Sequence, residues 1–517
     1  MINIGNPLSF SDIIKAINGN YSLALSESIR EKVRNTRNFL EEKISSGEIM
    51  YGVNTGFGKL ANTRIPNDEI IELQINLIRS HSAGQGKEIP PSISKLAMLL
   101  LLNSVAKGYS GIRENVLDSL KYAIEKDLIP ISYWFGSLGA SGDLAPLAHL
   151  VLGLTGEGPI FDLKHKQKYE KITEADPDFP IIKLDSKEGL ALINGTHFST
   201  AFLSFSTEKS MSLFFHSLIN AALSSEALKA IITVYSPLIH NIRFHEGQKK
   251  TAEIINVLLE GSSFIKSAPD EEIVQNPYSI RCTPQIMGGI FYSIKNAIQT
   301  LEIEINSVTD NPLVFPEEKK VLSGGNFHGE PIGFAAEFLS LGLAKLASLS
   351  QVRTEKILNP AYNYGLPAFL VNHPGLNSGY MIAHYTQASL LNKVNVLANP
   401  VITGNIPVSA MQEDIVSMSM NAATKSFEIS DLVEKIIAIE LIVTIQALDL
   451  REKKEGGKSS PVLQNIRNYV RSKIEFLDKD RIIKNDIDEA VKIIQSKELL
   501  RIVSKNTGIN YEDIFQT

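Results

Sequence analysis

The sequence predicts a mainly α-helical protein in which long helices form a bundle and short β-hairpins are minor elements. Long segments of the chain carry apolar residues on nearly every face and contain few helix-breaking residues, as is typical of helices packed among other helices. Regular alternation of apolar and polar residues, the pattern of a half-buried strand, is scarce. The chain has 517 residues, 44% of them hydrophobic, which is enough to bury a large core.

The predicted elements follow from these patterns. Short hairpins are expected near residues 159–183 and around residues 313–322. The segment 331–352 has only Glu337 and Lys345 as charges in its middle, so other helices should surround it. The long helices are expected over residues 208–234, 285–307, 331–352 and 418–448.

We expect three consecutive regions along the chain. The first, residues 1–186, carries a glycine-rich motif described below, and the second, residues 187–450, is the central long-helix bundle. Residues 452–458 read EKKEGGK, and this shift in composition marks an exposed loop. The third region, residues 451–517, is expected to be a helical tail.

Composition excludes several classes of function. The net charge is −6 with both signs mixed along the chain, so we expect no basic face and neither nucleic acid nor an anionic membrane as a partner. The sole cysteine, Cys282, excludes an intrachain disulfide and a multi-cysteine zinc site, and it suits a reducing compartment. The first residues, MINIGNP, have neither the basic start nor the apolar stretch of a signal peptide. We expect a cytoplasmic protein.

A long segment without charge lies between Lys356 and Lys393. Hydropathy alone would allow a membrane helix there. However, Pro360, Pro367 and Pro374 would break a spanning helix and leave polar groups unpaired in lipid. We therefore expect no membrane span, and the segment is either a buried loop between helices or a contact between subunits.

Residues 136–149 read GSLGASGDLAPLAH, and the Ala140-Ser141-Gly142 at their centre could become a reactive ring. If the amide nitrogen of Gly142 attacks the carbonyl of Ala140, loss of water there and from Ser141 leaves a methylidene-imidazolone. This ring is an electrophile that no ordinary side chain supplies. Gly142 has no Cβ to obstruct closure, and Gly139 allows backbone angles that other residues avoid.

The residues after the tripeptide predict a helix that begins beside it. Asp143 suits a helix N-cap and Pro146 suits the first turn. The positive end of the helix dipole would then face the ring. Two other interpretations remain, a flexible surface loop and a phosphate-binding backbone nest. No Gly-Lys-Ser/Thr follows, so a nucleotide-binding loop has weak support.

The stretch 136–149 resembles the signature of the histidine and aromatic amino acid ammonia-lyases. Other blocks match in the family's order, and the resemblance runs from Tyr51 to beyond Met418. It implies the long-helix bundle of the aromatic amino acid lyases. The matching blocks are Tyr51–Gly58 (YGVNTGFG), Ser80-His81, Asn194–Thr196 (NGT), Gln275–Arg281 (QNPYSIR), Thr309–Pro312 (TDNP), Ser323–His328 (SGGNFH) and Gln412–Asp414 (QED).

The resemblance implies a reaction and roles for its residues. The cofactor would be 4-methylidene-imidazol-5-one (MIO), formed from Ala140-Ser141-Gly142, with no metal and no diffusible cofactor. Tyr51 would be the general base, which requires a lowered phenol pKa. Arg281 would bind the substrate carboxylate through two parallel hydrogen bonds. The positions implied near the ring are Asn194, Gln275, Tyr278 and Phe327. On the residues alone, an interface tyrosine, an intersubunit salt bridge and a core phenylalanine are the commoner fates of Tyr51, Arg281 and Phe327.

The expected substrate depends on which side chains of the site can pair with the ring of the amino acid. An imidazole needs polar partners, because burying an unpaired polar group costs about 1–3 kcal/mol. His81 and Glu413 are the candidates, and Glu413 resembles the histidine-specific branch of the family. Glu413 could also be a helix-start carboxylate. The sequence departs from that branch at Ile415, where the branch usually has His, and at Met411, where it has Asn.

We therefore expect elimination of ammonia from L-histidine to give trans-urocanate. Three alternatives stay open: a tyrosine or phenylalanine lyase, an aminomutase with the same cofactor, and a catalytically silent helical assembly. The resemblance implies a homotetramer in which each site uses residues of three chains. The long apolar helices agree with an extensive interface.

Overall fold

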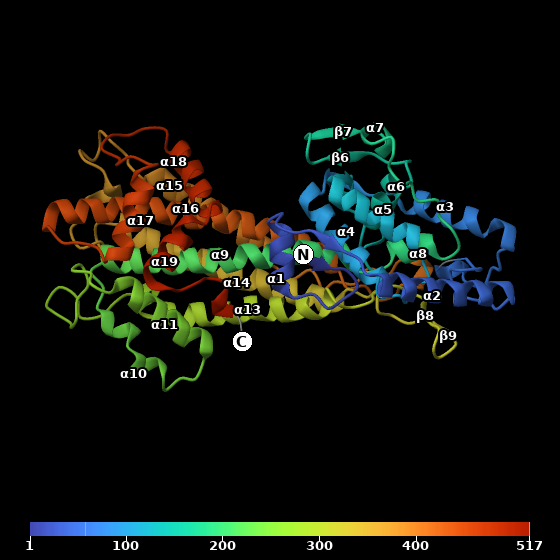
Figure 1. Cartoon of the computed structure of the whole chain (residues 1–517). Coiled ribbons are helices and arrows are strands. Elements are labelled where there is room, and N and C mark those ends of the chain that lie inside the picture. The colour runs from blue at the N-terminus through green and yellow to red at the C-terminus, as the bar shows by residue number, and fades with distance from the viewer. Residues whose placement is uncertain (57, 516–517) are drawn as a thin grey trace. The chain divides into compact units, whose positions relative to one another are not determined.

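The computed structural model describes residues 1–56 and 58–515, which form nineteen α-helices and nine short strands (Figure 1). The prediction of a mainly α-helical fold is confirmed, since 58% of the chain is helical. The chain forms two compact units, each assembled from three separate stretches. The first unit comprises Met1–Ser206, Ala297–Glu337 and Pro400–Phe427, and the second comprises Thr207–Asn296, Phe338–Asn399 and Glu428–Thr517.

Four of the five unit boundaries fall inside long helices. This division differs from the three consecutive regions expected from the sequence, which follow chain order and stay a prediction. The four helices are α9 (His197–Ala227), α13 (Thr283–Glu304), α14 (Glu330–Leu358) and α16 (Ser419–Glu455).

The first unit contains all nine described strands. The described strands form four small sheets: β1 pairs parallel with β2, and the pairs β3–β5, β4–β6, β6–β7 and β8–β9 are antiparallel. Both predicted hairpins are present, as β6–β7 and β8–β9. The elements are β1 (Ile2–Asn3), α1 (Phe10–Ile17), β2 (Leu23–Ala24), α2 (Glu27–Ser45), α3 (Ile70–His81), β3 (Gln85–Glu88), α4 (Pro91–Val105), α5 (Glu114–Lys126), β4 (Leu128–Pro130), β5 (Tyr133–Phe135), α6 (Leu144–Leu154), β6 (Ile160–Asp162), β7 (Gln167–Tyr169), α7 (Ile172–Ala175), α8 (Glu188–Ile193), β8 (Leu313–Phe315) and β9 (Lys320–Leu322), with 3-10 turns at Gly58–Leu60, Asn67–Glu69 and Ser409–Met411.

The second unit is helical apart from its loops. Its C-terminal stretch, Glu428–Thr517, is also mainly helical. Besides its parts of the long helices it contains α10 (Pro237–His240), α11 (Glu246–Leu259), α12 (Tyr278–Arg281), α15 (Met381–Leu397), α17 (Pro461–Arg471), α18 (Ile483–Gln495) and α19 (Glu498–Thr507), with 3-10 turns at Ile232–Tyr235, Ala368–Leu370 and Asp513–Phe515.

Local chemistry explains where the long helices differ from their predicted bounds. Helix α9 ends at Ala227, and Lys229 has a left-handed φ of 50°, which stops the helix short of residue 234. Helix α14 continues to Leu358, just before Asn359-Pro360, because a residue before proline is disfavoured in a helix. Helix α16 continues into the loop expected at 452–458 and ends at Glu455, just before Gly456, whose φ is 71°.

Helix α9 is buried along most of its length although it is rich in serine. Several of its serine hydroxyls are satisfied within the helix: Ser204 donates to the carbonyl of Thr200 at 2.7 Å, and Ser225 donates to that of Ala221 at 2.8 Å. Such bonds allow a polar side chain to be buried without an unpaired donor. One described helix, α14, is long and apolar enough by composition to cross a membrane, and 67% of that apolar window is buried.

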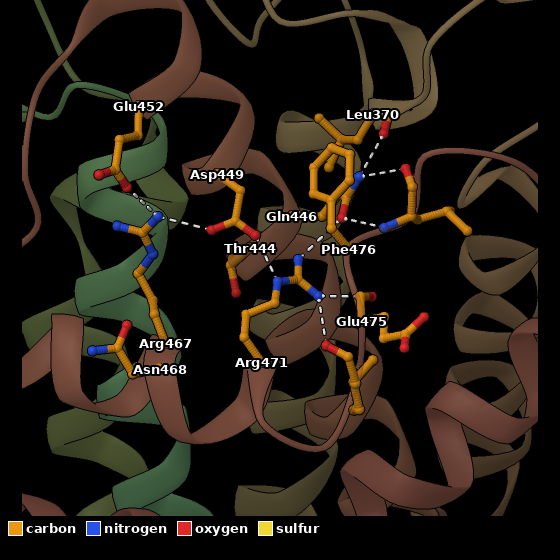
Figure 2. A network of polar contacts seen from close by, with 12 residues as sticks. Leu370, Thr444, Gln446, Asp449, Glu452, Arg467, Asn468, Arg471, Glu475 and Phe476 are labelled. Carbon is orange, nitrogen blue, oxygen red and sulfur yellow. Dashed lines mark hydrogen bonds and ion pairs between the residues drawn. The ribbon is translucent and has the colours of Figure 1, made fainter.

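A polar network joins the C-terminal segment to α16 within the second unit (Figure 2). Nε2 of the fully buried Gln446 donates to the carbonyls of Leu370 and Leu477, and its Oε1 accepts from Arg471 and from the amide of Leu477. Asp449 accepts from Arg467 at 2.8 Å and from Arg471 at 2.6 Å. Every hydrogen-bonding group of the Gln446 carboxamide is thereby used.

Candidate active site

The loop that carries Ala140-Ser141-Gly142 is pressed against other parts of the first unit. Gly142 has a φ of 74°, and a Cβ there would lie 2.1 Å from the carbonyl oxygen of Gly195. Gly139 has a φ of 72°, and a Cβ there would lie 2.3 Å from Oγ of Ser417. Both positions therefore require glycine, for the backbone angle and for the close approach.

Hydrogen bonds fix the backbone on both sides of the tripeptide. Oγ of Ser137 donates to the carbonyl of Gly142 at 3.1 Å and accepts from the amide of Gly139 at 3.1 Å. The carbonyl of Gly139 accepts from Oγ of Ser417 at 2.8 Å and from the amide of Gly329 at 3.0 Å. The tripeptide is thus held at both ends, and Ala140 is buried.

Asp143 occupies the N-cap position of α6, as predicted, but its side chain does not cap the helix. Its Oδ2 accepts instead from the amide and hydroxyl of Ser199, at 2.7 and 3.0 Å, and its own amide donates to Gly195 at 2.8 Å. Burial raises the pKa of the Asp143 carboxyl to about 7. The expected capping bond is therefore replaced by one that ties the loop to the start of α9.

A cavity of about 900 Å³ opens beside this loop, within the first unit. Its lining comes from segments far apart in the sequence, which the fold brings together. Seven of the predicted site residues line it, whereas Gly142 lies behind the lining. They are Tyr51, His81, Ala140, Ser141, Asn194, Phe327 and Glu413.

Tyr51 and Asn194 are held in place by hydrogen bonds. The phenol oxygen of Tyr51 accepts from the amide of Gly58 at 3.1 Å, so the glycine-rich block YGVNTGFG folds back on its own tyrosine. Phe57 of this block lies outside the described residues. Asn194 follows α8 and is only 4% exposed, and its Nδ2 donates to the carbonyl of Asn311 at 3.2 Å.

Glu413 lies in a loop and not at a helix start, which excludes the helix-start interpretation. Its backbone pairs with Val408 across a tight turn, and its Oε1 accepts from the hydroxyl of Ser141 at 3.1 Å. Burial lowers the pKa of His81, and the negative charge of Glu413 opposes this change. Nδ1 of His81 lies 3.1 Å from Oγ of Ser80. The predicted pair, His81 and Glu413, therefore interacts electrostatically at the cavity.

Gln275, Tyr278 and Arg281 belong to the second unit and do not line this cavity. All three are exposed, and Tyr278 is 72% exposed. The Arg281 guanidinium carbon lies 5.9 Å from the centre of the Tyr278 ring, and Arg281 forms no ion pair within the described residues. Its positive charge is available to a ligand or to another subunit.

Sequence reasoning gave no role to several residues of the cavity. Asn311 belongs to the quoted block TDNP, but only the structure shows that its carbonyl faces Asn194. Ile415, a position where the chain departs from the histidine branch, lines the cavity, whereas Met411 does not. Leu190 and Ile193 of α8 form part of its apolar wall. The part of the chain that the structure describes contains no cluster of three or more His, Cys, Asp or Glu residues that could hold a metal.

Comparison with known families shows to which family this chain belongs. A family model described as aromatic amino acid lyase matches residues 8–472. The chain belongs to the aromatic amino acid lyase family. Among the aromatic amino acid lyases, it is 41% identical to the histidine ammonia-lyase of Clostridium tetani over 517 residues, which covers 99% of each chain.

Solved structures of aromatic amino acid lyases share this fold. The histidine ammonia-lyase of Trypanosoma cruzi is 34% identical, with a TM-score of 0.89 over 99% of this chain and 97% of that chain. The tyrosine aminomutase of Streptomyces globisporus is 30% identical, with a TM-score of 0.92 over 99% of this chain and 100% of that chain. The resemblance inferred from the motifs is confirmed.

Proposed function

We propose that this chain catalyses the non-oxidative elimination of ammonia from L-histidine to give trans-urocanate. The observation that carries the substrate is the carboxylate of Glu413 at the cavity, 3.1 Å from the hydroxyl of Ser141 and in electrostatic contact with His81. A carboxylate at the cavity suits an imidazole N–H and would be left unpaired beside a phenyl ring. The names of the similar histidine ammonia-lyases support the same choice.

The tripeptide Ala140-Ser141-Gly142 fits the MIO cofactor, which belongs to this proposal. The support is steric: Gly142 sits where any Cβ would overlap Gly195, and the flanking carbonyls are fixed by Ser137 and Ser417. When formed, the ring supplies an electrophile for the amino group of the substrate. No metal is needed for the elimination proposed here.

In the proposed elimination, side chains and amides of this chain accept the proton and stabilise the charges that develop. The β C–H bond breaks and its proton passes to the phenol oxygen of Tyr51, while the C–H electrons form the double bond and ammonia leaves from the α carbon. The amide of Gly58, 3.1 Å from that oxygen, stabilises the phenolate that accepts the proton. Asn194 supplies an amide donor at the cavity, and the apolar wall formed by Leu190 and Ile193 excludes water.

A homotetramer with shared active sites is the assembly that we propose. Gln275, Tyr278 and Arg281 are exposed on the second unit, so a neighbouring chain can receive them, with Arg281 binding the substrate carboxylate. Helix α15 has Lys393 as its only Lys, Arg, Asp or Glu, yet it exposes Ile382, Tyr385 and Val396. Helices with few charges and several exposed apolar residues are typical of subunit contacts. The cytoplasmic location expected from the sequence stays part of the proposal.

A competition assay tests the substrate. The purified chain is given L-histidine, L-tyrosine and L-phenylalanine, and the ultraviolet absorbance of each unsaturated acid is followed. Urocanate as the main product is expected. Coumarate or cinnamate in its place would contradict the choice of histidine, and a β-amino acid product would indicate an aminomutase. Intact mass tests the cofactor, since a ring-bearing chain is lighter than its sequence by two waters.

A further inference from the structure

Two side-chain contacts tie both ends of helix α8 to one short segment of the first unit. Lys187 is the N-cap residue of α8, and its Nζ lies 2.6 Å from Oδ2 of Asp310. At the other end of the helix, Nδ2 of Asn194 donates to the carbonyl of Asn311 at 3.2 Å. Because Asp310 and Asn311 are neighbours in the chain, these contacts hold both ends of α8 against the same short segment.

The pair of Lys187 and Asp310 is unusually deeply buried for an ion pair. Their side chains are 0% and 2% exposed. Burial lowers the pKa of Lys187, and the carboxylate of Asp310 opposes that change. A buried ion pair is weak support for stability, since well-packed apolar residues often do as well, and its best-attested use is to fix one arrangement over others. The arrangement fixed here is that of α8.

Asp310 also controls the backbone that receives the Asn194 amide. Its Oδ1 accepts from the amide of Asn311 at 2.6 Å, and Oδ1 of Asn311 accepts from the amide of Gly324 at 2.8 Å. Residue Asn311 is therefore held through both its backbone amide and its side chain. Asn194 and Asn311 line the cavity, whereas Lys187 and Asp310 do not.

We propose that Lys187 and Asp310 are positioning residues that fix the carboxamide of Asn194 at the cavity. Lys187 sets where α8 begins, and Asp310 sets the direction of the carbonyl that binds Asn194 where α8 ends. Neither residue touches the substrate in this proposal. The inference rests on the proposed function, because the catalytic role of Asn194 is assigned there.

A double-mutant cycle tests this inference with the full-length protein. Lys187→Met is expected to lower kcat roughly tenfold to a hundredfold and to change KM by less than about threefold, since misplacing a catalytic group mainly affects the chemical step. In an Asn194→Ala background, Lys187→Met is expected to have little further effect on kcat, because the carboxamide that Lys187 positions is already absent. The same fold-loss in both backgrounds would overturn the proposal. Lys187→Arg should recover part of kcat.

A control and a second readout separate positioning from folding. Lys209→Met removes another lysine ion pair, to Asp431 at 2.6 Å, from residues that do not line the cavity, and kcat should stay unchanged. If Lys187→Met does not fold, Asp310→Asn, which keeps the side-chain volume, replaces it in the cycle.

The second readout is a crystal structure of the folded variant, which needs no activity. Displacement of the Asn194 amide from the Asn311 carbonyl is expected, and an unchanged contact would overturn the proposal. Wild-type turnover of the three amino acids tests the proposed function separately, so either idea can fail alone.

Discussion

The hydroxyl of Ser141 donates a hydrogen bond to Oε1 of Glu413 at 3.1 Å. The residue expected to become part of the cofactor thus contacts the residue expected to choose the substrate. Under the proposed function, ring formation removes this hydroxyl as water, and the Glu413 carboxylate is then free to accept from the substrate imidazole.

Replacing this carboxylate should change substrate preference. Glu413→Gln keeps the shape and removes the charge, so kcat/KM for L-histidine should fall by roughly tenfold to a hundredfold, the equivalent of about 1.5–3 kcal/mol for a charge-assisted hydrogen bond. Steady-state assays on histidine and phenylalanine measure this. Glu318→Gln, in the exposed hairpin between β8 and β9, is the control and should leave both rates unchanged. An equal loss on both substrates would contradict a role in selectivity.

The packing of Gly142 makes a prediction about cofactor formation. In Gly142→Ala the new Cβ would overlap the Gly195 carbonyl at 2.1 Å and the residue would be held at a φ of 74°. We expect no loss of two waters by intact mass, and a stability loss of more than about 1–2 kcal/mol by urea unfolding. Gly289→Ala in α13 is the matched control, since its Cβ meets nothing within 4 Å. It should be stabilised by about 0.5–1 kcal/mol. Complete ring formation in Gly142→Ala would contradict the steric argument.

Asp143 should make stability depend on pH. Burial raises its pKa from 3.8 to about 7, so between these values the folded chain binds more protons at this site than the unfolded chain. Its contribution to stability is therefore fully present below about pH 4 and is lost as the pH rises to about 7. Asp143→Asn removes this titration. The difference in melting temperature between the wild type and this variant, measured from pH 4 to pH 8, should shift in favour of the variant as pH rises. A constant difference would rule out this assignment.

The proposed sharing of sites between subunits predicts that two inactive variants rescue each other. Ser141→Ala lacks the ring precursor and Arg281→Gln lacks the carboxylate-binding charge, so each alone should be almost inactive. Co-expressed chains that mix at random should recover about a quarter of wild-type specific activity, since that share of sites combines an intact ring with an intact arginine. Light scattering should give the same assembly for all samples. Absence of rescue in mixed tetramers would place Arg281 and the ring of one chain in one site.

The sequence predicts that the long helices and the loop of the candidate site exist, but it does not predict which distant residues they contact. Helix α14 was predicted because apolar residues cover its faces, and that signal is local. The partner of Asp143 was not predicted, because Ser199 is distant in the sequence and competes with the local capping bond. For the same reason, the sequence alone does not indicate that the Asn311 carbonyl accepts from Asn194. The role proposed for Arg281 depends on an assembly, which periodicity within one chain does not encode.

The network around Gln446 has a practical consequence for anyone who shortens this protein. The family match ends at residue 472, which suggests a convenient place to stop the chain. Stopping there would take away both contacts that Gln446 makes to Leu477 and the carbonyls of Ile474 and Glu475 that bind Arg471. The buried carboxamide of Gln446 and the guanidinium of Arg471 would then each lose two of their hydrogen bonds. The polypeptide therefore cannot be cut where the family match ends. The residues just after position 472 belong to the same folding unit as α16.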